Sequence, residues 1–358
     1  MIAIYQKHLI YSFLKSFLKV CVFFFSLIII LNLFEEISFL KNSDTGYYLP
    51  LFLTLLNSLS VLFDVLPFIF LISTLYFFTE ILDKNELIVY KSFGLTNSRI
   101  IKTIAATTFA VGIFSIIILY NISSNLKFLY LDIKNDYSKD DKYLAVVTAN
   151  GLWIKDEING KINIINAAKI DGNYLLNVLI TQLDLNFEFK KLIRSSNVNI
   201  KDNNWVLKDP YITIDNKTKK IDNLVFQTNF NKQKIKNLFS NLSSLNLWQL
   251  KKLKKDYELL GYSTILLSAH QHKLYSYPLY LTIMVCISSI LMLNIKHNNS
   301  KAFNLILGIL ISVLIYYINY SFNVLIESKN IPFVVSIWGP QLILILITTI
   351  GLVNINEK

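Results

Sequence analysis

The sequence predicts an α-helical membrane protein with six transmembrane helices and an antiparallel, jelly-roll-like β-domain inserted between helices 3 and 4. The first observation is a set of long apolar runs, three before a polar block and three after it. A bilayer core of ~30 Å needs ~20 apolar residues, and each run reaches or approaches that length. The runs are Val20–Phe34, Leu49–Thr79, Thr103–Leu126, Leu274–Ile295, Ala302–Ile326 and Asn330–Asn356. The second observation is that 53% of the residues are hydrophobic, more than in a typical globular chain.

These runs divide the chain into three parts. Residues 1–126 are expected to hold an N-terminal interfacial helix, helices 1–3 and a short cytoplasmic helix at about 84–100. In that short helix Leu87, Tyr90 and Phe93 recur at three-residue steps, and Gly94 is expected to end it. Residues 127–268 are expected to form the β-domain with a helical connector at its end, and residues 269–358 to form helices 4–6.

The positive charges of the short loops predict the orientation, because cytoplasmic loops are enriched in Lys and Arg. One side carries Lys7, Lys15, Lys19, Lys84, Lys91, Arg99, Lys102, Lys296 and Lys301. The opposite short loops carry only Lys41 and Lys329. We therefore expect both termini in the cytoplasm and the β-domain in the periplasm or exterior.

The polar block reads as short strands followed by a helix, because β-branched and aromatic residues alternate with Asn, Asp and Gly turns. The expected strands are Tyr143–Thr148, Gly151–Lys155, Ile162–Ala167, Val178–Asn186 and two strands within 196–214 around Asp202-Asn203-Asn204, with a turn at Asn216–Lys220. A leucine stripe from Leu247 to Leu260 predicts the helix, and Gly261 its end.

Several function classes have no support in the residues. The net charge of +11 is spread over interleaved Lys and acidic residues with only two arginines, Arg99 and Arg194, so no nucleic-acid partner is expected. The sequence has no GxxxxGK[ST], HExxH, GxSxG or CxxC pattern. We therefore expect no catalytic residue, metal or cofactor, and Cys21 and Cys286 are expected to pack within apolar helices.

Two features leave alternatives open. Asp64 is the one charge inside an apolar run, and such a group can mark a functional site, so an ion-coupled carrier is one alternative. A membrane-anchored periplasmic interaction or sensor protein is the other. His270 and His272 could form a pH-sensitive or metal-binding pair, although interfacial polar residues explain them as well.

The segment NELIVYKSFGLTNSRI (85–100) resembles the coupling helix of the LptF and LptG lipopolysaccharide (LPS) export permeases. HQHKLYSYPL (270–279) is similar to the start of helix 4 in that family, and NIPFVVSIWGP (330–340) to the start of helix 6. The order of all elements fits the family over essentially the whole chain. NGLWIKD (150–156) resembles LptG more than LptF.

The resemblance implies a permease subunit without its own catalytic activity, in an ABC-type transporter. Its implied partners are the dimeric ATPase LptB, the paralogous permease (LptF, or LptG if this chain is LptF), LptC, LPS and membrane lipids. LPS would be extracted from the inner membrane and passed to a periplasmic bridge toward the outer membrane.

The resemblance also assigns residues. Glu86, Leu87 and Gly94 match the coupling helix that contacts the ATPase. Helices 1 and 5 line the lipid path in this family, which points to Ile28, Asn32, Lys41, Tyr316, Tyr317 and Tyr320. The chain departs from the family where LptG proteins often carry Lys at the outer end of helix 1. Glu35 and Glu36 stand there, with Lys41 as the nearest cation.

Overall fold

The structure is a computed structural model, and it describes most of the chain. The described residues are 4–41, 46, 48–137, 152–158, 160–215, 217–232, 234–235, 241–259, 263–293, 301–327 and 331–356. The chain divides into two compact units, Met1–Lys127 together with Ile265–Lys358, and Phe128–Thr264.

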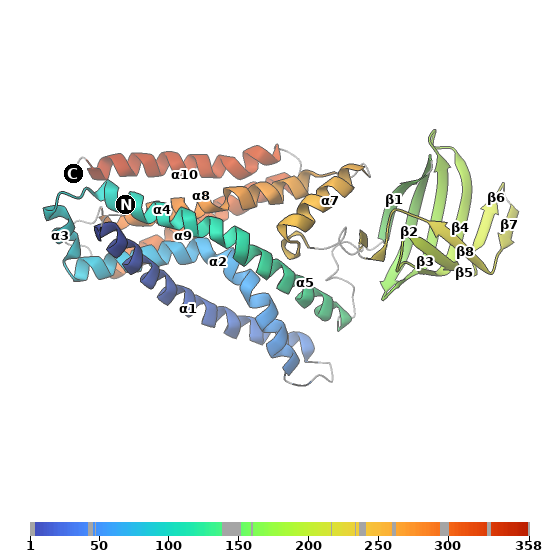
Figure 1. The fold of residues 1–358 in the computed structure, drawn as a ribbon, viewed down its shortest axis with the longest axis horizontal. Helices are drawn as coiled ribbons and strands as arrows, with labels where there is room; N and C mark the ends of the chain where they lie inside the picture. Colours follow the sequence, from blue (N-terminus) through green and yellow to red (C-terminus); the bar gives the residue numbers. More distant parts are fainter. Residues whose placement is uncertain are drawn as a thin grey trace. The chain divides into compact units, whose positions relative to one another are not determined.

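The first unit consists of long apolar helices (Figure 1). They are α1 (Ile4–Leu40), α2 (Tyr48–Asp83), α3 (Glu86–Ser92), α4 (Asn97–Phe114), α8 (Ile265–Leu293), α9 (Lys301–Glu327) and α10 (Phe333–Asn356). A π-helical turn, η1 (Ser115–Tyr120), joins α4 to α5 (Asn121–Asp136), which runs on into the second unit. Six helices among the described residues are long and apolar enough to cross a membrane, which confirms the predicted spans.

Residues 4–19 and the first apolar run form one continuous helix, α1. Within this helix Leu9 and Phe13 have no exposed surface, whereas Ile4 is 92% exposed. The Phe13 ring meets Phe77 of α2 edge-on at 5.6 Å, and Phe17 stacks on Phe70 at 4.4 Å. Aromatic packing therefore fixes the first half of α1 along the second half of α2.

Helices α2 and α8 form the centre of the bundle, because both carry buried side chains along most of their length. The Tyr277 hydroxyl of α8 donates a hydrogen bond to the carbonyl of Phe63, and the two rings stack at 4.5 Å. Further along, Ser288 Oγ donates to the Leu71 carbonyl at 2.9 Å. These bonds pair polar groups that would otherwise be unsatisfied in an apolar interior.

Both ends of the chain and α3 lie at the same end of this bundle (Figure 1). His8 Nε2 is 3.4 Å from Glu86 Oε2 of α3, and Asn97 Nδ2 donates to the Ile355 carbonyl at 3.4 Å. This arrangement agrees with an even number of spans.

The second unit contains an antiparallel, curled sheet of eight described strands (Figure 1). They are β1 (Leu152–Ile158), β2 (Lys161–Asp171), β3 (Tyr174–Asp184), β4 (Phe189–Asn199), β5 (Asn204–Lys208), β6 (Tyr211–Ile214), β7 (Lys217–Lys220) and β8 (Asn223–Gln227). The order is β1-β2-β3-β4-β5-β8, and β6 pairs with β4 and β7 beside this path. The inserted antiparallel β-domain is therefore confirmed.

One face of the sheet forms the core of this unit. Ile165 of β2 lies opposite Ile180 of β3, which lies opposite Ile193 of β4, and all three are fully buried. Trp205 is fully buried too, and its indole N–H donates to the Phe230 carbonyl at 2.8 Å. The sequence-predicted helix is present as α7 (Leu247–Leu259), which follows the 3-10 turn η2 (Leu242–Ser244).

Two strand predictions need correction. Within 196–214 the structure has three strands, because Asp209, at φ 48°, and Pro210 interrupt the ladder between β5 and β6. The Asn216–Lys220 segment was predicted as a turn, but Lys217–Lys220 is strand β7, paired with β6. Lysine-rich edge strands lack the apolar pattern on which the prediction relied. The predicted strand Tyr143–Thr148 lies outside the described residues.

Candidate functional site

The candidate site is the short helix α3, which connects α2 to α4. Its start is set by Asn85, whose left-handed backbone at φ 57° ends α2 and redirects the chain. Asn tolerates this conformation better than most residues. Beyond α3, the Thr96 side chain caps α4 by accepting a bond from the Arg99 N–H. Only two residues separate α2 from α3, so a displacement of α3 acts directly on the end of α2.

Gly94 ends α3, as the sequence predicted. At φ 78° it closes a Schellman motif, in which its N–H donates to the Lys91 carbonyl at 2.9 Å and the Leu95 N–H donates to the Tyr90 carbonyl at 3.1 Å. Tyr90 and Leu95 are each 8% exposed. The backbone bonds close the end of the helix, and the burial of Tyr90 and Leu95 holds this side of α3 against the rest of the protein.

The other side of α3 presents apolar side chains to the surroundings. Ile88 is 66% exposed, Val89 50% and Phe93 79%, whereas Leu87 is half-buried. The predicted stripe of Leu87, Tyr90 and Phe93 therefore does not form one buried face. A rigid helix that exposes three large apolar residues is typical of a surface that contacts a partner.

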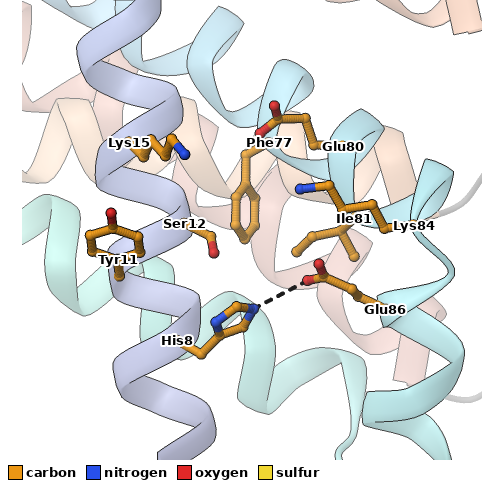
Figure 2. A pocket seen from close by; sticks show the side chains of 9 residues that line it. All are labelled: His8, Tyr11, Ser12, Lys15, Phe77, Glu80, Ile81, Lys84 and Glu86. Carbon is orange, nitrogen blue, oxygen red and sulfur yellow. Dashed lines mark hydrogen bonds and ion pairs between the residues drawn. The ribbon is translucent and has the colours of Figure 1, made fainter.

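Glu86 opens α3 and lies beside a cavity of about 210 Å³ (Figure 2). Its carboxylate points toward His8 of α1, with Nε2 and Oε2 3.4 Å apart. Besides the His8–Glu86 pair, three charged residues and four neutral ones line the cavity: Lys15, Glu80 and Lys84, together with Tyr11, Ser12, Phe77 and Ile81. The cavity therefore lies where α1, the end of α2 and α3 meet.

A second carboxylate, Glu80, joins α1 to α2 beside this cavity. Lys19 Nζ donates to its Oε1 at 2.8 Å, and Ser16 Oγ donates to its Oε2 at 3.1 Å. Tyr76, one turn earlier on α2, donates to Oε1 at 3.2 Å. Sequence reasoning missed His8 and Glu80. Their one signal was the placement of charges at the ends of predicted spans 1 and 2.

Tyr90 is the one residue of α3 with a strongly shifted pKa. Burial of its hydroxyl, with a smaller contribution from the negative charge of Glu86, raises the pKa of Tyr90 to about 12. Both effects disfavour the phenolate. The phenol is therefore neutral over the whole physiological range, and it packs as part of the apolar attachment of α3.

A family model described as "Lipopolysaccharide export system permease LptF/LptG" matches residues 7–354. The chain belongs to the LptF/LptG family. The match covers the helices on both sides of the β-domain and the β-domain itself, so the resemblance noted from the coupling-helix segment is confirmed over nearly the whole chain. The family model covers both permeases and does not distinguish LptF from LptG. No curated protein matches the chain.

The LptF/LptG resemblance also assigned lipid-path residues, and the structure places these in two different environments. On α1, Ile28 is 5% and Asn32 8% exposed. On α9, Tyr316, Tyr317 and Tyr320 are all more than half exposed, and Tyr316 stacks on Tyr320 at 6.5 Å. Lys41 is exposed in the turn after α1.

The two helices that carry these residues, α1 and α9, have different main packing partners. Helix α1 packs against α2 and α4, whereas α9 packs against α2, α8 and α10. Among the residues that the structure describes, the buried amide Nδ2 of Asn32 has no hydrogen-bond partner. A buried amide of this kind is costly unless another molecule satisfies it.

Asp64 lies in a polar cluster rather than in a purely apolar environment. The charges of Lys127 and Lys273 act on its carboxylate, and its own charge acts on the hydroxyls of Tyr120 and Tyr277. The sequence alone showed no partner for Asp64, since Lys127 and Lys273 stand in distant parts of the chain. In the folded chain, the charges of these two lysines act on the carboxylate.

The two histidines of α8 have separate aromatic partners. His270 Nε2 is 2.9 Å from the Tyr120 hydroxyl, and the Trp338 indole donates to His272 Nδ1 at 3.2 Å. Among the residues that the structure describes, no group of three or more His, Cys, Asp or Glu side chains could hold a metal ion. The arrangement favours the interpretation of both histidines as interfacial polar residues.

Proposed function

We propose that this chain is a permease subunit of an ABC-type LPS transporter, and that α3 is the helix by which a separate ATPase drives it. The observation that carries the proposal is the pairing of a fixed side and an exposed apolar side on α3. Tyr90 and Leu95 hold the helix to the bundle, while Ile88, Val89 and Phe93 face outward. An ATPase that binds the exposed side of α3 can move the bundle only if the buried side of α3 stays attached to the bundle.

The proposed partner at α3 is the LptB ATPase dimer. We keep the assignment that the family resemblance implied, with Glu86 as the coupling-helix acid that contacts the ATPase and Leu87 and Gly94 as its neighbours in that helix. The exposed apolar residues supply contact area, and the Glu86 carboxylate supplies a charged contact beside it. Apolar anchors flanked by polar groups are typical of specific interfaces.

The proposed orientation places both termini and α3 in the cytoplasm, with the chain in the inner membrane. The end of the bundle that holds α3 also holds Lys15, Lys84 and Lys91, which supports this assignment through the positive-inside rule. The β-domain then lies in the periplasm, where its edge strands would pair with the jelly-roll folds of LptC and of the paralogous permease. The segments 1–126, 127–268 and 269–358 remain the proposed functional divisions.

The proposed substrate is LPS, an amphiphile whose movement needs apolar walls and no covalent chemistry. The exposed tyrosines of α9 offer aromatic surface for acyl chains, whereas Ile28 is 5% exposed and would contact them only after α1 moves. Asn32, with its buried amide, and Lys41 offer polar groups for the sugar or phosphate part. The proposed direction is from the inner membrane toward the outer membrane.

Depletion of the chain tests this function directly. Newly made LPS should accumulate in the inner membrane of depleted cells, and normal delivery to the surface would contradict the proposal. In the purified complex, Glu86→Ala should leave the chain folded and should lower the LPS released per ATP hydrolysed. Copurification and coupling that are unaffected by Glu86→Lys would show that Glu86 is not the coupling acid.

A further inference from the structure

We propose that Glu80 is a positioning residue that clamps α1 to the end of α2, so that α1 moves with the coupling helix α3. The inference rests on the proposed function, since it assigns the path by which movement of α3 reaches the helix that carries Ile28 and Asn32. The clamp consists of the hydrogen bonds from Ser16 and Lys19 of α1 to the Glu80 carboxylate of α2.

The geometry at Glu80 uses both carboxylate oxygens. Oε1 accepts from Lys19 at 2.8 Å and from Tyr76 at 3.2 Å, while Oε2 accepts from Ser16 at 3.1 Å. Lys19 also lies 5.1 Å from the centre of the Tyr76 ring. Ser16 and Lys19 stand about one helical turn apart on α1, as Tyr76 and Glu80 do on α2. Two turns of each helix are therefore bound to one carboxylate.

An isolated ion pair on a protein surface contributes little, because water screens it and the side chains lose freedom. The Glu80 cluster differs in two respects. Ser16 is fully buried, although the Lys19 and Glu80 side chains are 45% and 30% exposed. Several donors also share one carboxylate, which fixes its position more firmly than a single bond.

Further contacts join the same part of α1 to α2 and α3. Phe13 and Phe17 of α1 pack against Phe77 and Phe70 of α2. His8 of α1 reaches Glu86 of α3 (Figure 2). Glu80 stands six positions before Glu86 in the sequence, so the clamp lies near the start of α3.

Helix α1 is continuous from Ile4 to Leu40. Helices resist bending, so a displacement imposed at Ser16 and Lys19 is passed along α1 to Ile28 and Asn32. At 1.5 Å per residue these groups lie about 15–20 Å further along the axis. The clamp therefore provides a rigid connection between the proposed motor contact and the proposed lipid path.

The test measures LPS released per ATP hydrolysed in the purified, full transporter in lipid vesicles. Glu80→Gln and Lys19→Met should each lower this ratio at least threefold, while ATPase copurification and ATP hydrolysis are retained. Lys7→Met is the matched control, because Lys7 is an exposed lysine on the same helix, and it should leave the ratio unchanged.

The combined exchange Lys19→Glu with Glu80→Lys keeps an ion pair of reversed polarity, and it should recover most of the ratio. That recovery distinguishes a clamp from damage to folding, and it also covers the case in which a single variant assembles poorly. An unchanged ratio in Glu80→Gln and Lys19→Met, together with a lowered ratio in Glu86→Ala, would overturn the clamp and leave the proposed function intact. Failure of Glu86→Ala to change the ratio would instead count against the proposed coupling site.

Discussion

Gly112 of α4 and Pro278 of α8 approach so closely that a Cβ atom on Gly112 would lie 2.8 Å from the Pro278 Cα atom. No side chain can yield at this contact, because the nearest atom belongs to the backbone. Small residues allow membrane helices to pack in this way. The crossing of α4 and α8 therefore depends on the absence of a side chain at one position.

Gly112→Ala should destabilise the bundle by about 1–3 kcal/mol, as overpacking does in other cores. The measurement is the midpoint of thermal unfolding of the full chain in detergent. Gly339→Ala is the control, since a Cβ there would meet its nearest atom, Cε1 of Phe322, at 3.7 Å, an ordinary contact distance. Equal midpoints for the two variants would contradict the close crossing.

The buried indole of Trp205 is expected to stabilise the β-domain. Trp205→Phe keeps an aromatic ring but leaves the Phe230 carbonyl without its donor, at a cost of about 1–3 kcal/mol. Hydrogen exchange of the full chain, followed by mass spectrometry, should show faster exchange in β5 and β8. Trp153→Phe is the matched control, because Trp153 is 54% exposed. Unchanged exchange in Trp205→Phe would show that the indole bond is dispensable.

Tyr90 makes the attachment of α3 sensitive to strongly alkaline pH. The folded chain holds its phenol proton up to a pKa of about 12, above the ordinary value of 10.0. The folded state thus binds more protons than the unfolded state between these values, and stability falls as pH rises through this window. Protease cleavage near α3 should increase there in the natural chain and much less in Tyr90→Phe. The same rise in both proteins would assign it to another group.

Phe93→Ala tests the exposed side of α3 as a partner surface. Loss of an exposed aromatic anchor should weaken association with the ATPase by at least about 1 kcal/mol, or roughly fivefold in Kd. Phe187→Ala is the control, because Phe187 is a similarly exposed phenylalanine (66%) in the β-domain. Binding to the purified ATPase is the measurement. Equal affinities for Phe93→Ala and Phe187→Ala would place the partner elsewhere.

Asp64→Asn separates a structural role from ion-coupled transport. If Asp64 balances Lys127 and Lys273, the variant should accumulate to lower levels in the membrane, because those cations lose their counter-charge. Adding Lys127→Met should restore the level. Normal accumulation with loss of transport, unaffected by the second substitution, would instead support the carrier alternative.

The sequence alone predicted the six spans, the inserted β-domain and the helix end at Gly94. The spans could be predicted from local composition, because the length of an apolar segment decides whether it can cross a bilayer. Gly94 was predictable because a left-handed helix end favours glycine. The division between β6 and β7 was not, since the lysines of β7 form a strand only through pairing with β6.

Only the tertiary structure decided which side of α3 is held and which is exposed. From the spacing of Leu87, Tyr90 and Phe93 alone, one could not predict that Tyr90 is buried while Phe93, next to the turn at Gly94, is exposed. Likewise, Glu80 and Lys19 are 61 positions apart, and nothing local relates them. Local composition determines where helices form, whereas contacts between distant segments depend on how the helices pack, and the proposed clamp belongs to that second kind.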